Sequence, residues 1–455
     1  MRNAEIATRP ARPSGFAGPA TLTAIRDDPL AFLAGTAERH PDRWWHETGG
    51  ERVLVVNHPD LARHVLRDRQ TNYTKAETPD DQMLTPLLGE GLLTTDGALW
   101  ARQRRMAAPS FRRQEVERFD SLITRAALDL VADWHRAAAE GRTVRVDHDL
   151  TGLTLRVIVA ALLGTDLQSL GPKFGEAVDA VNRYIGHVDP SAPAPADLRA
   201  RLGAYLGAKN FLDLTVRMLI SARVMTGPPP GAPPDLLSTL LAPPGHSEGF
   251  SGSELHDQVL TMIMAGHETT AKALTWSLHV LGGHPEQGAL VAAELDAVLG
   301  GRVPTAADLP DLVLTRAVVD ETMRIFPPVW LLSRRALEDD VMAGEPVPAG
   351  SLVCVSPWLL HRHPGFWDSP ERFRPERFRP GADAGRPSHL YLPFGGGPRI
   401  CLGKPFALAE ATLVLATVLP RVRLRHVPGH VVEPEALVTL RPRNGLLMTV
   451  EASDE

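Results

Sequence analysis

The stretch from Phe394 to Gly403 constrains this chain most, because its composition disfavours regular secondary structure. Three consecutive glycines are followed by a proline, and such a run interrupts both helices and strands. Cys401 follows this loop, and an Ala- and Leu-rich run from 406 to 415 then predicts a helix. A cysteine at a helix N-terminus lies near the positive end of the dipole, so we expect a lowered pKa and a metal-binding thiolate. Taken alone, the loop also allows a free, buried cysteine.

The same ten residues match a longer signature. Phe394, Gly397, Arg399, Cys401 and Gly403 occupy the fixed positions of Phe-x-x-Gly-x-Arg-x-Cys-x-Gly. This stretch resembles the haem-binding loop of the cytochrome P450 monooxygenases. The resemblance implies that these residues surround haem b and that the Cys401 thiolate is the axial ligand of its iron.

A second motif interrupts an apolar run from 259 to 265 that predicts a buried helix. It contains Gly266, Glu268 and Thr269. A glycine inside a helix costs about 1 kcal/mol relative to alanine, and a buried glutamate or threonine costs more unless it has a partner. Helix stability therefore does not account for this set, although a partly exposed surface helix remains an alternative.

The sequence Ala-Gly-His-Glu-Thr-Thr from Ala265 to Thr270 resembles the oxygen-activation motif of the same family. The resemblance implies that Ala265 borders the haem and that Gly266 leaves room for dioxygen. It also implies that Thr269 orders a proton relay and that Glu268 connects this relay to solvent.

A third motif contains Glu321 and Arg324, three residues apart in a helix expected from 310 to 326. An exposed pair of this kind contributes only about 0.2–0.5 kcal/mol. The pair resembles the Glu-x-x-Arg signature of the family, whose third member is the arginine of a Pro-Glu-Arg-Phe segment. That tetrapeptide occurs at 370–373 and again at 375–378, and we choose Arg377 because the later copy is nearer to Cys401. The three residues are expected to brace the cysteine loop.

Trp100 and Arg104 are four residues apart and so lie on one face of a short expected helix. Alone they indicate no more than a cation–π contact. The resemblance implies that both side chains donate hydrogen bonds to the haem propionates. It also implies a propionate-binding arginine near 334, for which we choose Arg334 while the adjacent Arg335 stays open.

Composition excludes several other classes of protein. The chain has 455 residues and a net charge of -6, which gives no reason to expect nucleic acid as a partner. Two cysteines exclude a disulfide scaffold. No apolar run reaches the roughly 18 residues of a membrane span, and the N-terminus lacks a signal-peptide core. We therefore expect a cytoplasmic protein without a membrane anchor.

The rest of the sequence predicts a mainly α fold with a small β-rich part. The resemblance implies a cytochrome P450 fold with the haem between the oxygen-activation helix and the cysteine loop. Residues 1–455 are expected to form one domain, with 1–20 a loosely held arm. An irregular segment is expected from 71 to 97, and long loops in compact domains are often functional. The resemblance implies that this segment covers the substrate pocket. Helices are expected at 29–40, twice within 115–165 and at 197–224, and strands at 52–57, 346–357 and 422–450.

The resemblance implies a haem-thiolate monooxygenase that uses dioxygen and receives electrons from a separate ferredoxin or flavodoxin with its reductase. The substrate is expected to be a hydrophobic small molecule such as a terpenoid, polyketide or fatty-acid-like compound, because the residues expected to line the pocket are apolar: Met262, Ala265, Val329 and Leu331. A peroxide-driven oxygenase or coupling enzyme, and a non-catalytic haem sensor or carrier, are the alternatives. The intact Glu268–Thr269 pair argues against both.

Overall fold

The structure is a computed structural model that describes residues 25, 28–48, 50–164, 171–186, 198–227, 235–242, 249–250 and 252–452. The expected arm at residues 1–20 lies outside these ranges. Among the described residues, no helix combines the length and the apolar character that a bilayer span requires.

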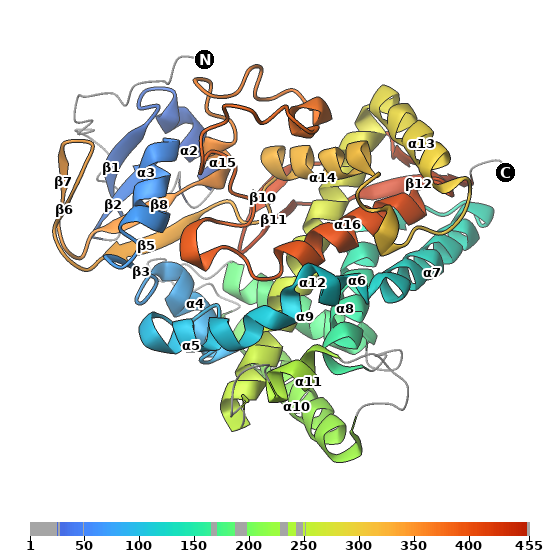
Figure 1. Cartoon of the computed structure of the whole chain (residues 1–455), viewed down its shortest axis with the longest axis horizontal. Coiled ribbons are helices and arrows are strands. Elements are labelled where there is room, and N and C mark those ends of the chain that lie inside the picture. The colour runs from blue at the N-terminus through green and yellow to red at the C-terminus, as the bar shows by residue number, and fades with distance from the viewer. Residues whose placement is uncertain are drawn as a thin grey trace.

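Helices make up most of the fold, as the sequence predicts (Figure 1). The central helix α12 (Gly252–Gly283) packs against α8 (Val146–Leu163), α14 (Val313–Ile325) and α16 (Lys404–Val418). Most of the residues of α12 are buried, including many of its polar positions. The other helices are α2 (Pro29–Ala37), α3 (Pro59–Arg63), α4 (Pro79–Leu88), α5 (Gly97–Ala107), α6 (Arg113–Glu117), α7 (Asp120–Ala139), α9 (Gly171–Gly186), α10 (Leu198–Thr226), α11 (Leu236–Leu241), α13 (Pro285–Leu299) and α15 (Pro357–Leu360).

The strands form a five-stranded sheet and three smaller ones (Figure 1). The larger sheet has the order β1-β2-β8-β5-β3, with β2 and β8 parallel and the other pairs antiparallel. Its strands are β1 (Arg43–Thr48), β2 (Glu51–Val56), β3 (Tyr73–Thr74), β5 (Leu332–Ala336) and β8 (Leu352–Val355). The others are β4 (Val144–Arg145), β6 (Asp340–Met342), β7 (Glu345–Val347), β9 (Val422–His426), β10 (Pro434–Ala436), β11 (Leu440–Pro442) and β12 (Leu447–Ala452).

The segment from 71 to 97 is not irregular throughout, so this expectation was wrong. Helix α4 occupies its middle, where Thr78 accepts a hydrogen bond from Asp81 N at 3.3 Å and Pro79 begins the first turn. These are standard helix-start signals. Pro86 lies near the end of α4, and Gly89 terminates the helix with a φ of 60°. Pro86 therefore lies inside a helix rather than in an irregular segment.

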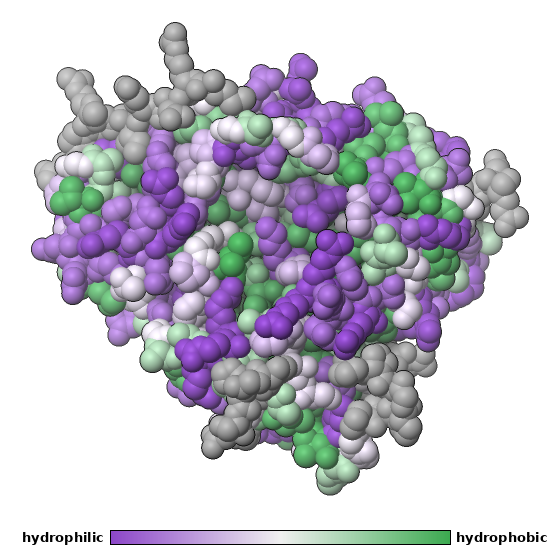
Figure 2. Space-filling model, in the orientation of Figure 1, coloured by the Kyte–Doolittle hydropathy of each residue, from purple (hydrophilic) through white to green (hydrophobic). Residues whose placement is uncertain are grey.

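The face shown in Figure 2 is largely hydrophilic, with hydrophobic side chains at its lower end near α10 and α11 and at its upper right near α13. Apolar residues exposed on α10 include Leu214, Met218 and Met225. The interior is one large cluster around α7, α8, α12 and α16, together with two small clusters that pack on the five-stranded sheet.

Candidate active site

The cysteine loop is held by close backbone packing that only glycine allows. Gly397 has a φ of 66°, and a Cβ at this position would overlap the carbonyl oxygen of Leu66. Leu66 belongs to a π-helical turn, residues His64–Asp68, that packs on the loop. The amide of Cys401 donates a hydrogen bond to Phe394 O at 2.9 Å, which closes the loop before α16 begins.

Cys401 combines an accessible surface with a thiol that protein atoms surround closely. Its surface is accessible, yet burial raises the pKa of the thiol. Backbone N–H groups of Gly403 and Lys404 and the charge of Arg104 oppose this increase without overcoming it. The expected net lowering of the pKa by the helix end alone was therefore wrong. The N–H groups still point at the sulfur, where they would stabilise a thiolate.

One face of α12 opens to accessible space within its otherwise buried middle. Ala265 is exposed and Thr269 is half-buried, whereas Met264, His267 and Glu268 are buried. Residues 265 and 269 share this face because they are one helical turn apart. The Thr269 hydroxyl donates to Ala265 O at 2.8 Å. Because a hydroxyl also accepts hydrogen bonds, the lone pairs of this oxygen remain available to a ligand.

Gly266 brings two helices together. A Cβ at this position would lie 3.0 Å from Ile158 Cγ1, so the glycine allows α12 and α8 to approach closely. The same contact gives a structural reason for a residue that the sequence assigned to dioxygen. That assignment stays a prediction.

Glu268 is held by a residue that the sequence did not indicate. The Thr439 hydroxyl donates to Glu268 Oε1 at 2.8 Å, and both side chains are buried. Thr439 lies between β10 and β11. Its partner is 171 positions away, and no periodicity in the sequence marks such a pair.

A cluster of cations lies beside the cysteine loop. The pKa of Arg104 is lowered by burial and by Arg399, and is raised by Cys401, so Arg104 lies near both. Burial and the charge of Arg399 lower the pKa of Arg334 to about 10. The Arg399 guanidinium carbon lies 4.5 Å from the centroid of the Trp100 ring, and that of Arg104 lies 5.8 Å from the same ring. The structure thus brings together the four residues predicted to bind the propionates.

Lys75 and Asp96 complete this cluster and were not predicted. Burial, followed by the charges of Arg334 and Arg399, lowers the pKa of Lys75 to about 8. Arg399 Nη2 donates to Asp96 Oδ1 at 2.8 Å, and Lys75 N donates to Asp96 Oδ2 at 2.7 Å. Burial alone raises the pKa of Asp96, but hydrogen bonds from Thr74 and Arg399 hold it well below its usual range. The one sequence signal was Asp96 itself, which precedes α5 as an N-cap.

Arg334 and Arg335 have different surroundings. Arg335 forms an ion pair with Glu51 at 2.5 Å and donates to Gly350 O and Glu77 O. Arg334 is buried, faces Arg399 and donates to the adjacent Ser333 O. The geometry therefore favours Arg334 as the residue that is free to bind a propionate.

The predicted brace forms a buried ion-pair network. Arg324 donates to both carboxylate oxygens of Glu321, at 2.7 and 2.8 Å, and both side chains are fully buried. Arg377 Nε lies 3.4 Å from Glu321 Oε1, so the arginine that pairs with this carboxylate comes from the later tetrapeptide. Arg324 also donates to the carbonyls of His361, Pro370 and Arg372.

His361 connects this network to the cysteine loop. Its Nε2 accepts a hydrogen bond from Leu392 N at 2.8 Å, and its Nδ1 lies 3.1 Å from Arg324 O. Burial, with the charges of Arg324 and Arg362, lowers the pKa of His361 to about 3, so the imidazole is neutral. Gly395 N then donates to Leu392 O at 3.0 Å, at the start of the loop. The brace therefore acts on the loop through a histidine that no motif indicated.

The residues predicted to line the substrate pocket have mixed surroundings. Met262 is buried on α12, Val329 is half-buried, and Leu331 packs against one of the small clusters on the sheet.

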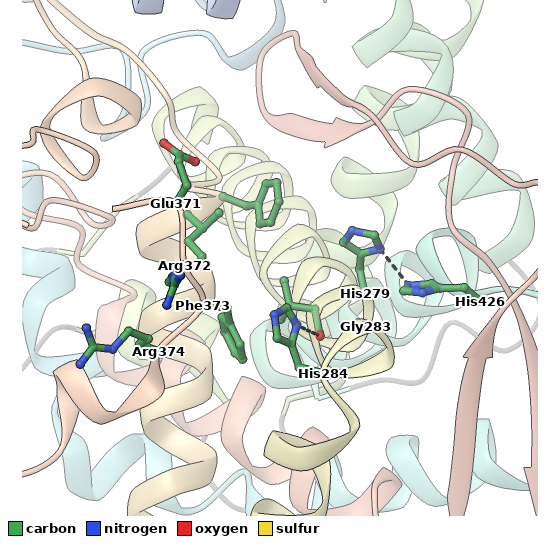
Figure 3. Close-up of a pocket in the computed structure, with 11 residues that line it drawn as sticks. His279, Gly283, His284, Glu371, Arg372, Phe373, Arg374 and His426 are labelled. Atoms are coloured by element: carbon green, nitrogen blue, oxygen red, sulfur yellow. Dashed lines mark hydrogen bonds between the residues drawn. The ribbon is translucent and has the colours of Figure 1, made fainter. Parts of the chain in front are cut away.

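A pocket of about 580 Å³ lies elsewhere, between the end of α12, the end of α14 and the segment 371–374 (Figure 3). His279 and His426 are hydrogen-bonded at its edge, and none of the predicted site residues lines it.

The site combines Cys401, a cluster of cations beside it, and the Glu268–Thr269 pair on α12. This combination is that of a haem-thiolate oxygenase. The chain belongs to the cytochrome P450 family, since a family model described as "Cytochrome P450" matches residues 10–448. Its cofactor is haem with a cysteine thiolate ligand, and its activity is that of a monooxygenase.

Characterised relatives and a solved structure agree with this assignment. The chain is 35% identical to "Cyclooctatin synthase" of Streptomyces melanosporofaciens over 93% of this chain and 91% of the relative. It is 34% identical to "Pentalenene oxygenase" of Streptomyces avermitilis, with 90% of each chain covered. It also resembles the crystal structure of the cytochrome P450DA heme domain, with a TM-score of 0.87 and 26% identity over 98% of this chain and 97% of that one.

The described residues suit this cofactor. Lys75, Arg104, Arg334 and Arg399 form the cluster, and the nearby carboxylates are Asp80, Asp81 and Asp96. Four cations against three carboxylates leave a net positive charge, which suits the anionic propionates of a haem. The Cys401 thiol is accessible beside Arg104, as an axial ligand must be.

Proposed function

We propose that this monooxygenase hydroxylates a cyclic terpenoid. Two relatives with about a third of their residues identical are named for the compounds cyclooctatin and pentalenene, as cyclooctatin synthase and pentalenene oxygenase. A third, "Cyclooctat-9-en-7-ol 5-monooxygenase" of Streptomyces melanosporofaciens, is 33% identical over 88% of this chain and 86% of the relative. The apolar character of Met262, Ala265 and Val329 supports a hydrophobic substrate.

The observation that carries the residue assignments is that α12, with its open face, and the cysteine loop pack on one hydrophobic cluster, which Phe394 and Leu402 contact from the loop. In this proposal Cys401 is the axial ligand, while Phe394, Gly397 and Gly403 shape the loop around it. Arg104, Arg334 and Arg399 bind the propionates, with Trp100 beside them. The bound haem supplies the redox chemistry that splits dioxygen.

Thr269 and Glu268 deliver protons at the open face of α12. The Thr269 hydroxyl orients a proton donor toward this face, and the Glu268 carboxylate exchanges protons behind it. Because Gly266 has no side chain, it leaves room for dioxygen at this part of the helix. Ala265 borders the substrate. A peroxide-driven oxygenase would not require this relay.

Electrons come from a separate ferredoxin or flavodoxin with its reductase in this proposal. Residues 1–455 act as one cytochrome P450 domain, and the protein works in the cytoplasm. The free thiols Cys354 and Cys401 support this location, because the cytoplasm keeps cysteines reduced.

The substrate proposal is tested with four ligand classes: a cyclic sesquiterpene, a cyclic diterpene alcohol, a long-chain fatty acid and a macrolactone. Each is titrated into the haem-loaded protein while the Soret band is followed. The terpenoids should shift the band and should incorporate one atom of ¹⁸O₂ during turnover. Binding and oxygenation of the fatty acid or the macrolactone, with no response to either terpenoid, would refute the proposed substrate class.

A further inference from the structure

The loop between β10 and β11 reaches the oxygen-activation motif through one side chain. Thr439 is 5% exposed, and its hydroxyl donates to Glu268 Oε1 at 2.8 Å. Glu268 itself is 8% exposed. A buried carboxylate is costly unless hydrogen bonds stabilise it, so a donor at this position affects both its charge and its orientation.

Three further hydrogen bonds fix the loop that carries Thr439. Trp276 of α12 donates from its indole to Leu440 O at 3.1 Å, and Leu440 N donates to Pro328 O at 2.9 Å. Trp330 donates from its indole to Leu437 O at 2.8 Å. The backbone on both sides of Thr439 is therefore anchored, and the hydroxyl is presented to Glu268 from a rigid support.

The same anchors connect Glu268 to the expected wall of the substrate pocket. Pro328 and Trp330 flank Val329, which is half-buried. One short loop thus contacts both the acid of the proton relay and the segment expected to meet the substrate. A glutamate has three rotatable side-chain bonds, and a fixed donor limits the orientations that its carboxylate takes.

We propose that Thr439 is a positioning residue that holds the Glu268 carboxylate in the orientation required for proton delivery, so that electrons go into product rather than into peroxide. This inference rests on the proposed function of Glu268. In productive turnover, one substrate C–H group, one dioxygen, two electrons and two protons yield one alcohol and one water. When proton delivery is misdirected, one dioxygen, two electrons and two protons leave as hydrogen peroxide.

The first test needs no turnover. Thr439→Val removes the hydroxyl and nearly preserves the shape of the side chain, and its effect on the urea midpoint of the haem-loaded protein is measured in two backgrounds. In the natural chain the variant should lower the midpoint. In a Glu268→Ala background it should have little or no effect, because its partner is absent. Equal shifts in both backgrounds would show that Thr439 serves packing alone and would overturn the proposal.

The second test measures product and peroxide formed per electron pair with a terpenoid that is turned over. Thr439→Val should lower the product fraction several-fold, since a hydrogen bond to a charged group is worth about tenfold or more in population. Thr439→Ser keeps the hydroxyl and should restore most of the coupling. Unchanged coupling in Thr439→Val, or an equal loss in Thr439→Ser, would overturn the proposal.

Thr275→Val is the matched control. Thr275 is also a buried threonine, and its hydroxyl bonds to Ala271 O within α12 rather than to Glu268. This variant should keep the coupling of the natural chain. A loss as large as that of Thr439→Val would show that any buried threonine produces the effect, and would count against the proposal.

Failure of this inference differs from failure of the proposed function. If the natural chain oxygenates no terpenoid, the substrate proposal fails, while the urea comparison still decides whether Thr439 and Glu268 interact. If the natural chain forms product and Thr439→Val couples equally well, the role of Thr439 fails and the monooxygenase assignment stands.

Discussion

Arg399 lies against the indole ring of Trp100, with its guanidinium carbon 4.5 Å from the ring centroid. The first residue comes from the cysteine loop and the second from α5, so this contact joins two distant motifs of the chain. Asp96, at the start of α5, accepts a hydrogen bond from the same guanidinium. One side of the site is therefore pre-organised by protein groups.

Replacement of Arg399 should weaken haem retention. Arg399→Gln removes one of the clustered charges and leaves Asp96 without a charged partner at 2.8 Å. Loss of a hydrogen bond to a charged group costs about 1.5–3 kcal/mol, or roughly tenfold or more in affinity. The rate of haem transfer to a scavenging apo-globin measures this effect.

Arg423→Gln is the control for that measurement, because Arg423 is exposed on β9 away from the cluster. It should transfer haem at the rate of the natural chain. If Arg399→Gln also transferred haem at that rate, the propionate assignment of Arg399 would be wrong.

Removal of the buried brace should destabilise the protein severely. Arg324→Met leaves the buried Glu321 without both hydrogen bonds from Arg324 and frees three carbonyls. Breaking such a pair costs about 3–5 kcal/mol. Arg113→Met, which removes an exposed pair with Glu117, should cost about 1 kcal/mol or less. Denaturant unfolding compares the two variants, and equal losses would contradict the account of the brace.

Lowering the pH should destabilise the folded protein, in part through His46, a buried histidine on β1. Burial lowers the pKa of His46 from its ordinary 6.5 to about 4. Between these values the unfolded chain binds a proton that the folded chain does not, so acidification favours unfolding. The contribution is fully present above pH 6.5 and declines toward pH 4, by at most about 1.4 kcal/mol per pH unit.

His46→Leu should flatten this part of the stability–pH curve. Urea unfolding at several pH values between 4 and 7 measures the slope. A variant with the same slope as the natural chain would show that His46 is protonated in the folded state at these pH values.

Loss of the Thr269 hydroxyl should divert electrons from product. Thr269→Ala is expected to lower product per electron several-fold, because its hydroxyl lies on the open face of α12. Ser277→Ala removes a buried hydroxyl that bonds within the same helix, to Ala273 O, and should have no such effect. Product and peroxide are quantified per electron pair consumed. Equal coupling in Thr269→Ala and the natural chain would exclude Thr269 from the relay.

Local motifs made much of the site predictable. The Glu321–Arg324 pair and the shared face of Ala265 and Thr269 follow from helical spacing. The run of glycines that includes Gly397 predicted a loop rather than a helix or strand. The family fold followed from these motifs together. The start of α4 is also indicated by Thr78 and Pro79, although an irregular segment was expected there.

Long-range partners were not predictable in the same way. Thr439 binds Glu268, and Arg399 binds Asp96, although the partners are separated by more than a third of the chain length. No periodic pattern in the sequence marks such pairs. In the sequence, Lys75 looks like an ordinary solvent-exposed lysine, and the structure shows that it is buried. The direction of the Cys401 pKa shift also depends on burial, which a helix dipole alone does not reveal.

The most direct test of the central claim is the absorption spectrum of the reduced, carbon monoxide-treated protein. The natural chain and Cys354→Ala should both give the red-shifted Soret band of a thiolate-bound haem, because Cys354 is buried in β8. Cys401→Ser should lose that band. A thiolate-type band that persists in Cys401→Ser, or one that is absent from the haem-loaded natural chain, would contradict Cys401 as the axial ligand.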